Sequence, residues 1–321
     1  MNDFSRHRLD LGVGVGLRVP HYAEILRTRP QLDFFEIISE NFMVQGGKPL
    51  YHLGRVLEHY RVVQHGVSLG IAGPDEPDRA YLTSLKALAR RTRTPWVSDH
   101  FCWSGAGGAH LHDLLPVPYT PEAVRRTVVR ARMIQDFLEV PFALENTSSY
   151  LTYRSSTLSE WEFISEVAER ADIGLLFDVN NVYVSAYNHG FDAETFVRSV
   201  PHQRILQIHL AGHTNLGKYI IDTHRGAVIE PVLELYRQTI AACGPVSTLI
   251  EWDDEIPELP VLLAEAERAR RAREEGLSRR AGRDVPAASV VAAAAALPSP
   301  ATGAWKQGGP RESAAHEAVR S

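Results

Sequence analysis

Residues 142–181 read FALENTSSYLTYRSSTLSEWEFISEVAERADIGLLFDVNN. Two short apolar runs that end in a carboxylate, FALE and GLLFD, flank a segment with helical periodicity. That segment begins at Ser159, and Glu162 three residues later completes a capping-box pattern. A strand, a helix and a second strand in this order are typical of a parallel βαβ unit.

The same alternation extends in both directions from this unit. A further helix is predicted from Pro121 to Leu138, because Thr120 is a favourable N-cap and proline suits the first helical turn. The eight strands are predicted at Leu11–Leu17, Phe34–Asn41, Val62–Ile71, Trp96–Trp103, Phe142–Ser149, Ile173–Asn181, Ile205–Gly212 and Thr248–Asp253. Eight βα units favour an α/β fold of the (β/α)8 TIM-barrel type, in which the parallel sheet closes on itself.

An open, doubly wound sheet is the structural alternative. Its phosphate-binding turn is missing in usable form, since Gly12, Gly14 and Gly16 alternate within a predicted strand instead of leading into a helix. The barrel domain is assigned to residues 1–275. Residues 276–321 are predicted to be a disordered Ala/Pro/Arg-rich tail, because their composition cannot bury enough apolar surface to offset the entropy of ordering.

Composition limits the functional classes. The formal charge of −5, from 34 basic and 39 acidic residues, gives no overall attraction to nucleic acid or to an anionic membrane. No apolar run reaches the roughly 20 residues that span a bilayer, and the N-terminus lacks a signal-peptide core. Cys102 and Cys243 are the only cysteines, which argues against a disulfide framework and favours a cytoplasmic protein.

Ionisable side chains end several of the predicted strands. The clearest are His100, Glu145, Asp178, His209 and Glu251, and His65 is a weaker case. The carboxyl ends of barrel strands converge on one mouth, so these groups are expected to face one another. Because clustered buried carboxylates and imidazoles are unfavourable without compensating cations, the pattern predicts a metal centre.

The loops at the same face supply more candidates. They are Asn181, His189, His213, Asp222 and His224, of which Asp222 and His224 have the i, i+2 spacing that puts two side chains on one side of an extended segment. For His189 and His213 the sequence leaves two roles open: direct binding to a metal, or contact with a metal-binding residue or the substrate. Tyr150, Tyr183, Trp252 and Asp253 are candidates for orienting substrate or moving protons, with packing as the alternative.

The donors are nitrogen and oxygen, without a thiolate, which favours iron, manganese or zinc. Cys102 is close to His100 in sequence and is expected to be a buried free thiol.

Longer segments between about Leu11 and Ala266 carry a family resemblance. SDHFCW, LENTSSYLTY, LLFDVNNVYVSAYNHGFD, IHLAGH and IDTHRGAV are similar to those of the multinuclear non-heme iron-dependent oxidative enzymes. The resemblance implies a xylose-isomerase-like barrel. It also implies one metal bound by His65, His100 and Glu145, a second bound by Glu145 as bridge with Asp178, His209 and Glu251, and a third bound by Asp222, His224 and Asn181.

The activity that the resemblance implies is the oxidation of cysteine residues in a ribosomally made precursor peptide. It would use two or three iron ions of mixed Fe(II)/Fe(III) state, dioxygen as co-substrate, and a small partner protein that binds the peptide leader. The catalytic candidates are Glu145, Asp178, His213 and Asp253.

Two other functions fit the residues. One is a metal-dependent hydrolase or isomerase acting on a phosphate ester or a sugar. The other is a non-catalytic module that binds peptide or stores metal. No basic tract interleaved with aromatic residues points to nucleic acid.

Overall fold

Eight parallel strands close into a barrel in the computed structural model, which describes residues 8–107 and 109–282. Around the barrel they are β1 (Val13–Gly16), β2 (Phe34–Ile38), β3 (Arg61–His65), β4 (Val97–His100), β7 (Phe142–Glu145), β8 (Gly174–Asp178), β9 (Ile205–Ala211) and β12 (Ser247–Glu251), which pairs with β1. All of these pairings are parallel. The predicted barrel is confirmed, and the open sheet is excluded.

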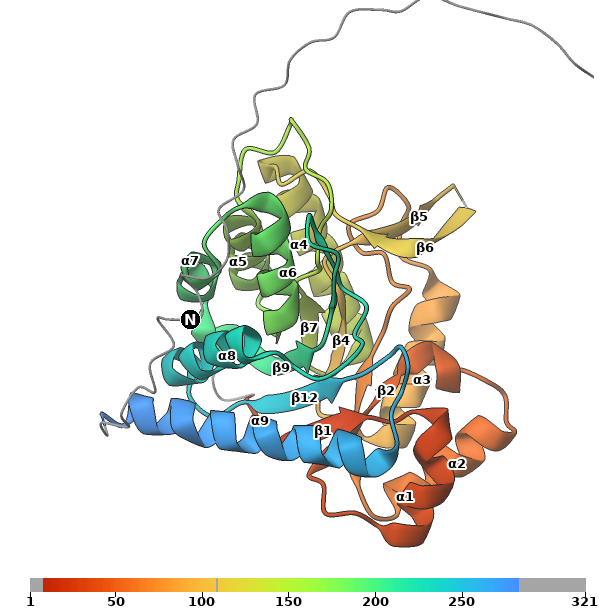
Figure 1. Ribbon diagram of the computed structural model, residues 1–321. Coiled ribbons are helices and arrows are strands. Elements are labelled where there is room, and N and C mark those ends of the chain that lie inside the picture. Colours follow the sequence, from red (N-terminus) through yellow and green to blue (C-terminus); the bar gives the residue numbers. More distant parts are fainter. Residues whose placement is uncertain (1–7, 108, 283–321) are drawn as a thin grey trace, which may run out of the picture. The chain divides into compact units, whose positions relative to one another are not determined.

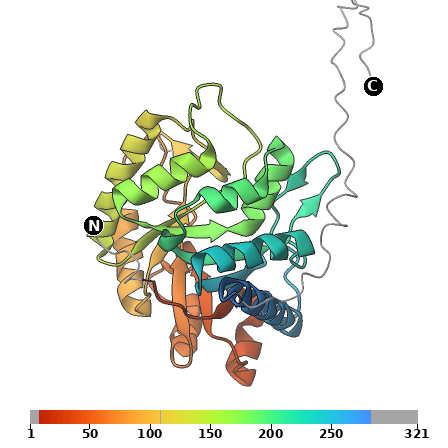
Figure 2. The ribbon, with the colours of Figure 1, turned by 90° about the vertical axis from the view of Figure 1, so that its left-hand side faces the viewer.

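Helices cover the outside of the barrel (Figures 1 and 2). They are α1 (Tyr22–Thr28), α2 (Lys48–Leu57), α3 (Arg79–Thr92), α4 (Pro121–Leu138), α5 (Glu160–Ala171), α6 (Val179–His189), α7 (Ala193–Ser199), α8 (Glu230–Cys243) and α9 (Leu259–Arg280). Short 3-10 helices η2 (Val19–His21), η3 (Ser39–Phe42) and η4 (His202–Arg204) join some of them to strands. Among the described residues, no helix is both long and apolar enough to cross a membrane.

Two predicted helix starts have the expected caps. The Thr120 side chain accepts a hydrogen bond from the Ala123 backbone N–H at the start of α4. At α5, the Ser159 hydroxyl accepts from the Glu162 backbone N–H while the Glu162 carboxylate accepts from that of Ser159, so the capping box is complete. These local patterns therefore set the helix boundaries.

Helix α9 continues past the predicted domain boundary at residue 275. Gly276 lies so close to α8 that a Cβ atom there would be 2.8 Å from the Arg237 carbonyl oxygen. Leu277 packs against the core. Packing on α8, which the Arg/Glu-rich sequence did not suggest, keeps the helix ordered to Arg280. The rest of the predicted tail, residues 283–321, lies outside the described residues.

Two small hairpins lie outside the barrel sheet and were not predicted. Strands β5 (Trp103–Ala106) and β6 (Ala109–Leu115) follow β4 and project from the body of the fold in Figure 1. Strands β10 (Thr214–Asn215) and β11 (Ile220–Ile221) follow β9. Both hairpins come after carboxyl ends of barrel strands, so they add walls to the barrel mouth.

The barrel interior has an apolar layer toward its amino-terminal end. Its buried residues, one from each barrel strand or its flank, are Leu11, Phe34, Val63, Trp96, Ala143, Leu176, Leu206 and Leu249. A second, larger apolar cluster fills the space between the strands and the helices. The apolar layer fills the barrel below the candidate site.

Candidate metal centre

The alternation of side chains along each strand places a polar layer directly above this apolar layer. Val63 is followed two residues later by His65, Ala143 by Glu145, Leu176 by Asp178 and Leu249 by Glu251. Side chains two residues apart point to the same face of a strand, so these groups also face the barrel interior. All four are at most 5% exposed.

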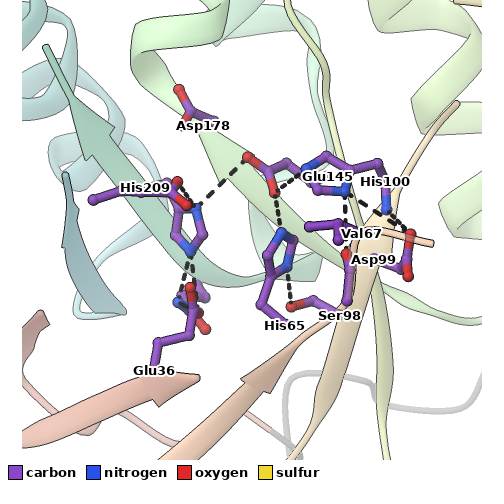
Figure 3. Close-up of polar contacts among 12 residues, drawn as sticks. Glu36, His65, Val67, Ser98, Asp99, His100, Glu145, Asp178 and His209 are labelled. Carbon is purple, nitrogen blue, oxygen red and sulfur yellow. Dashed lines mark hydrogen bonds and ion pairs between the residues drawn. The ribbon is translucent and has the colours of Figure 1, made fainter. Parts of the chain in front are cut away.

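Glu145 lies at the centre of the polar layer, between His209 on one side and His65 and His100 on the other (Figure 3). Its Oε2 atom is 3.3 Å from Nε2 of His65 and 3.3 Å from Nε2 of His100. Its Oε1 atom is 3.6 Å from Nδ1 of His209. The two carboxylate oxygens therefore face two different sets of donors.

Each of the three histidines is held by its outer ring nitrogen. Nδ1 of His65 is 2.9 Å from the Ser98 hydroxyl, and Nδ1 of His100 is 3.2 Å from the Gly66 carbonyl oxygen. Nε2 of His209 is 3.1 Å from Oε2 of Glu36. The other ring nitrogen of each faces Glu145, as expected for metal-binding histidines whose orientation is fixed by an outer hydrogen bond.

Asp178 and Glu251 complete a second group with Glu145 and His209. Oε2 of Glu251 is 2.9 Å from Nδ1 of His209. Asp178 is also the N-cap of α6, where its Oδ1 atom accepts a hydrogen bond of 2.6 Å from the Asn181 backbone N–H. The second oxygen, Oδ2, is buried without a hydrogen-bond partner.

Unpartnered buried atoms at this face test whether metal ions fit the site. Oδ2 of Asp178, Oε2 of Glu145 and Oδ1 of Asn181 are buried acceptors with no hydrogen bond. Buried polar atoms are almost always satisfied, so several unsatisfied acceptors in one place are suited to binding cations. Ligand atoms from His65, His100 and Glu145, and from Glu145, Asp178, His209 and Glu251, lie within 4.8 Å of one another in each group. The residues fit the two metal sites that the family resemblance implies.

Electrostatics of the metal-free site support this assignment. Burial raises the pKa of Asp178 well above its ordinary value, and the Glu145 charge adds to the effect. Burial disfavours the charged form of His100, but Glu145 and Asp99 outweigh it and raise its pKa to about 9. Burial and the neighbouring His100 lower the pKa of His65 well below its usual range. Without metal, protons on some histidines offset the carboxylate charge.

A third group of possible ligands lies at the rim and includes residues that the resemblance did not assign to the third metal. Ligand atoms of His224, Glu251 and Asp253 lie within 4.8 Å of one another. Nδ1 of His224 is 3.4 Å from Oε2 of Glu251 and 3.3 Å from Oδ2 of Asp253, whereas its Nε2 is 3.0 Å from Oδ1 of Asp222. Asp222 and His224 are therefore adjacent as expected, and Glu251 and Asp253 also lie beside His224. Asn181 lines the same cavity as Asp222 and His224.

Close packing against Gly212 positions the loop that carries His224. A Cβ atom at Gly212 would be only 2.2 Å from the Arg225 carbonyl oxygen and 2.4 Å from that of Gly226. His224 itself has a φ of +49°, in the left-handed region that costs free energy for a residue with a Cβ. The Asp253 backbone N–H donates to the His224 carbonyl oxygen at 3.0 Å. The tertiary contacts therefore impose this loop geometry.

A chain of polar side chains leads from this third group into α6. Nδ2 of Asn180 donates to Oδ1 of Asp222 at 2.8 Å, and Oδ1 of Asn180 is 2.7 Å from Nδ1 of His213. The His213 ring stacks on Tyr183 with centroids 5.3 Å apart. His213 thus contacts the site through Asn180, which the sequence analysis did not select.

Asn181 and His189 also lie on α6, which corrects their predicted positions at a strand end and in a loop. The Asn181 amide donates to the Asn146 carbonyl oxygen at 3.0 Å and leaves its own oxygen free. His189, at the last turn of α6, is exposed, and its Nε2 is 2.8 Å from the Ser149 carbonyl oxygen. The structure does not bring His189 into any of the three groups.

A cavity of about 890 Å³ opens above the metal centre. His100, Asn181, Asp222 and His224 are among its lining residues, together with Ser104 and Leu114 from the β5–β6 hairpin. The exposed Tyr150 also lines it, and its hydroxyl accepts from the Asp222 backbone N–H at 2.8 Å. This volume exceeds that of one small side chain, so a bulky substrate segment could reach the site.

Two more residues that contact the site, Glu36 and Ser98, were missed in the sequence. Glu36 interrupts the apolar run FFEII, and strand alternation two residues after Phe34 could have identified it. Ser98 holds His65, but a serine within a strand carries no distinctive signal. Cys102 is buried as predicted, and burial raises its pKa well above the ordinary value, so it is a neutral thiol.

Comparisons with known proteins identify relatives of this chain. The sequence profile of the family described as "RiPP precursor modification enzyme MbnB/TglH/ChrH" matches residues 12–274. A UPF0276 protein of Anaeromyxobacter sp. (strain Fw109-5) is 51% identical over 259 residues, covering 81% of this chain and 92% of that protein. A UPF0276 protein of Caulobacter vibrioides (strain NA1000 / CB15N) is 48% identical over 260 residues, covering 81% of this chain and 93% of that protein.

Solved structures with a similar fold include sugar epimerases. An L-ribulose 3-epimerase has a TM-score of 0.56 at 16% identity, covering 84% of this chain and 95% of its own. A D-tagatose 3-epimerase-like protein has a TM-score of 0.54 at 15% identity, with 84% and 98% covered. At such low identity the likeness concerns the fold alone, and it confirms the predicted xylose-isomerase-like barrel.

Proposed function

The chain belongs to the MbnB/TglH/ChrH family of RiPP precursor modification enzymes, and on that basis we propose that it oxidises cysteine residues of its precursor peptide with iron and dioxygen. The observation that carries this proposal is the position of Glu145. One of its oxygens faces His65 and His100, and the other faces His209. A carboxylate placed in this way can bridge two ions and offset part of their mutual repulsion.

The proposed ligand sets follow the three groups. His65, His100 and Glu145 would hold one iron, and Glu145, Asp178, His209 and Glu251 would hold a second. His224 would hold a third, either with Asp222 and Asn181, as the resemblance implies, or with Glu251 and Asp253. Iron, when bound, would supply the redox chemistry, with dioxygen as the oxidant.

The chain's own side chains would bind and orient the peptide. The cavity above the centre gives a peptide segment access to the face on which His100 and His224 lie. Asn180 donates to Asp222 and accepts from His213, so this polar chain would hold a proton on Nδ1 of His213. The apolar layer beneath keeps water away from the buried side of Glu145.

We extend the proposal to a small partner protein that binds the peptide leader. The cavity accommodates only a segment of a peptide, so recognition of the rest needs a surface elsewhere.

The decisive test determines which metal the protein needs and which reaction it then carries out. The protein is loaded anaerobically with Fe(II) and mixed with a Cys-containing precursor peptide and the partner, and dioxygen uptake is followed together with the peptide mass. Oxygen-dependent mass change in the native peptide, absent from its Cys→Ser variant, is expected. A zinc-loaded or manganese-loaded protein that acts without oxygen on a phosphate ester or a sugar would instead establish the hydrolase or isomerase alternative.

A further inference from the structure

Arg18 is a buried cation beside the third group. It follows β1 by two residues, and its side chain is 10% exposed. Its Nε donates to Oδ1 of Asp253 at 2.9 Å, and its Nη2 pairs with the same oxygen. Nη2 is also 3.7 Å from Oε1 of Glu251. The guanidinium group therefore contacts two of the three residues that could hold an ion with His224.

The end of β1 has a space for this guanidinium group. A Cβ atom at Gly16 would be 2.7 Å from Nη1 and 2.8 Å from Cζ of Arg18. Both distances are shorter than real Cβ contacts allow, so the side chain folds back over a position where only glycine leaves room. Arg18 is therefore packed in place, unlike a surface arginine.

The carboxylates of the third group divide their oxygens between two kinds of cation. Oε2 of Glu251 faces His209 and His224, whereas Oε1 faces Arg18. Oδ2 of Asp253 faces His224, whereas Oδ1 binds Arg18. By contrast, in the part of the chain that the structure describes, Glu145 forms ion pairs with histidines alone.

We propose that Arg18 is a built-in counter-cation that competes with metal at the His224–Glu251–Asp253 group and makes this ion the most weakly held of the three. A metal ion there would lie close to a fixed positive charge and would share both carboxylates with it. The inference rests only on the metal-binding part of the proposed function. It assigns the chain two firmly held ions and one exchangeable ion.

Metal release from the full chain tests this directly. Wild type, Arg18→Gln and Gly16→Ala are loaded anaerobically with Co(II), dialysed against increasing concentrations of a chelator, and analysed for metal per chain. Wild type should release one ion before the others. Arg18→Gln should need about tenfold more chelator to release that ion, since loss of the competing charge tightens its binding.

Gly16→Ala gives an independent route to the same effect. Its new methyl group meets the far end of a flexible side chain and no backbone, so the barrel can accept it while Arg18 is displaced. Release of the weakest ion should shift in the same direction as in Arg18→Gln. This variant decides the question if Arg18→Gln does not fold.

Arg237→Gln is the matched control. Arg237 is equally shielded, at 12% exposed, and pairs with Glu230, Glu234 and Glu275 on α8 and α9. Its loss should leave metal release unchanged. Release of the weakest ion at the same or a lower chelator concentration in both Arg18→Gln and Gly16→Ala would overturn the proposal, because Arg18 would then support the site. The assay measures release and not turnover, so a protein inactive on peptide still gives the expected result.

Discussion

The metal centre has two regions of different construction. The groups that share Glu145 consist of residues on barrel strands, and none of their side chains is more than 9% exposed. In the rim group, His224 and Asp253 lie in loops after β11 and β12, and their side chains are 16% and 36% exposed. Only Glu251 belongs to both regions.

This difference shows how the same residue types can give sites of unequal strength. Neighbouring strands hold the inner donors in register, and each inner histidine has an outer hydrogen-bond partner. The rim geometry depends on a left-handed residue, a loop packed on Gly212 and an arginine counter-ion. Preorganised donors need little further ordering when an ion binds, so the inner ions should be held more tightly than the ion at the rim.

Replacing Glu145 should have the largest effect. Glu145→Gln keeps the side-chain size but removes the charge shared by both inner groups, so we expect loss of both inner ions and at least a hundredfold loss of peptide oxidation. Elemental analysis of the anaerobically purified variant measures this. Glu265→Gln, at another buried glutamate, which accepts from the Val228 backbone N–H, is the control. Full metal content in Glu145→Gln would refute the bridging role.

Replacing Asp222 should separate the two regions. Asp222→Asn removes the charge next to Nε2 of His224 while keeping an oxygen that can accept from Asn180. We expect the loss of one ion per chain, with the inner ions retained. Asp254→Asn, in an exposed loop position nearby, should retain all ions. Loss of inner ions in Asp222→Asn would show that the two regions are not separate.

Replacing Glu36 should weaken the inner region without emptying it. Glu36 orients His209 and does not face Glu145 itself. Glu36→Gln should lower affinity at the His209 group by about 10- to 100-fold, the usual effect of losing an outer partner of a metal-binding histidine. Competition with a chromophoric chelator gives the affinity. An unchanged value would mean that Gln207 alone is enough to orient the ring.

The pH dependence of metal binding is expected to be at most about tenfold for each pH unit. The pKa of His100 in the metal-free protein is about 9, above the ordinary 6.5. Its proton therefore stabilises the metal-free fold fully below pH 6.5, and this contribution is lost as the pH rises through 9. A metal ion must displace that proton, so affinity should rise by up to about tenfold per pH unit between these values.

Calorimetry in buffers of different ionisation enthalpy counts the protons released. His100→Gln should release one proton fewer than wild type near pH 7.5. Equal release by both proteins would mean that the histidine is already neutral before metal binds.

The inner region could largely be predicted from sequence because it follows strand periodicity. Glu145, Asp178 and Glu251 each end an apolar run, so the strand prediction also places all three at the same end of the barrel. Glu36 was missed although it obeys the same two-residue rule, since it lies within a run and not at its end. The family resemblance, and not the periodicity, assigned these residues to separate metal ions.

The rim could be predicted only in part, because loop paths depend on contacts between distant residues. Asp222 and His224 were chosen from their spacing, but the approach of their loop to Gly212 has no local signature. The same holds for Arg18, which reaches Asp253 across 235 positions of sequence. Asp178 is both the last residue of β8 and the N-cap of α6. Asn181 and His189 therefore lie on a helix that the pattern FDVNN did not indicate.

The apolar layer beneath the site has a topological consequence. Phe34, Trp96 and Leu176 are at most 1% exposed and belong to the layer that fills the barrel below Glu145. The reaction chamber is therefore a blind end and not a tunnel. A polymer that brings a residue to Glu145 cannot pass through the barrel, so it must both arrive and leave on the side of the mouth.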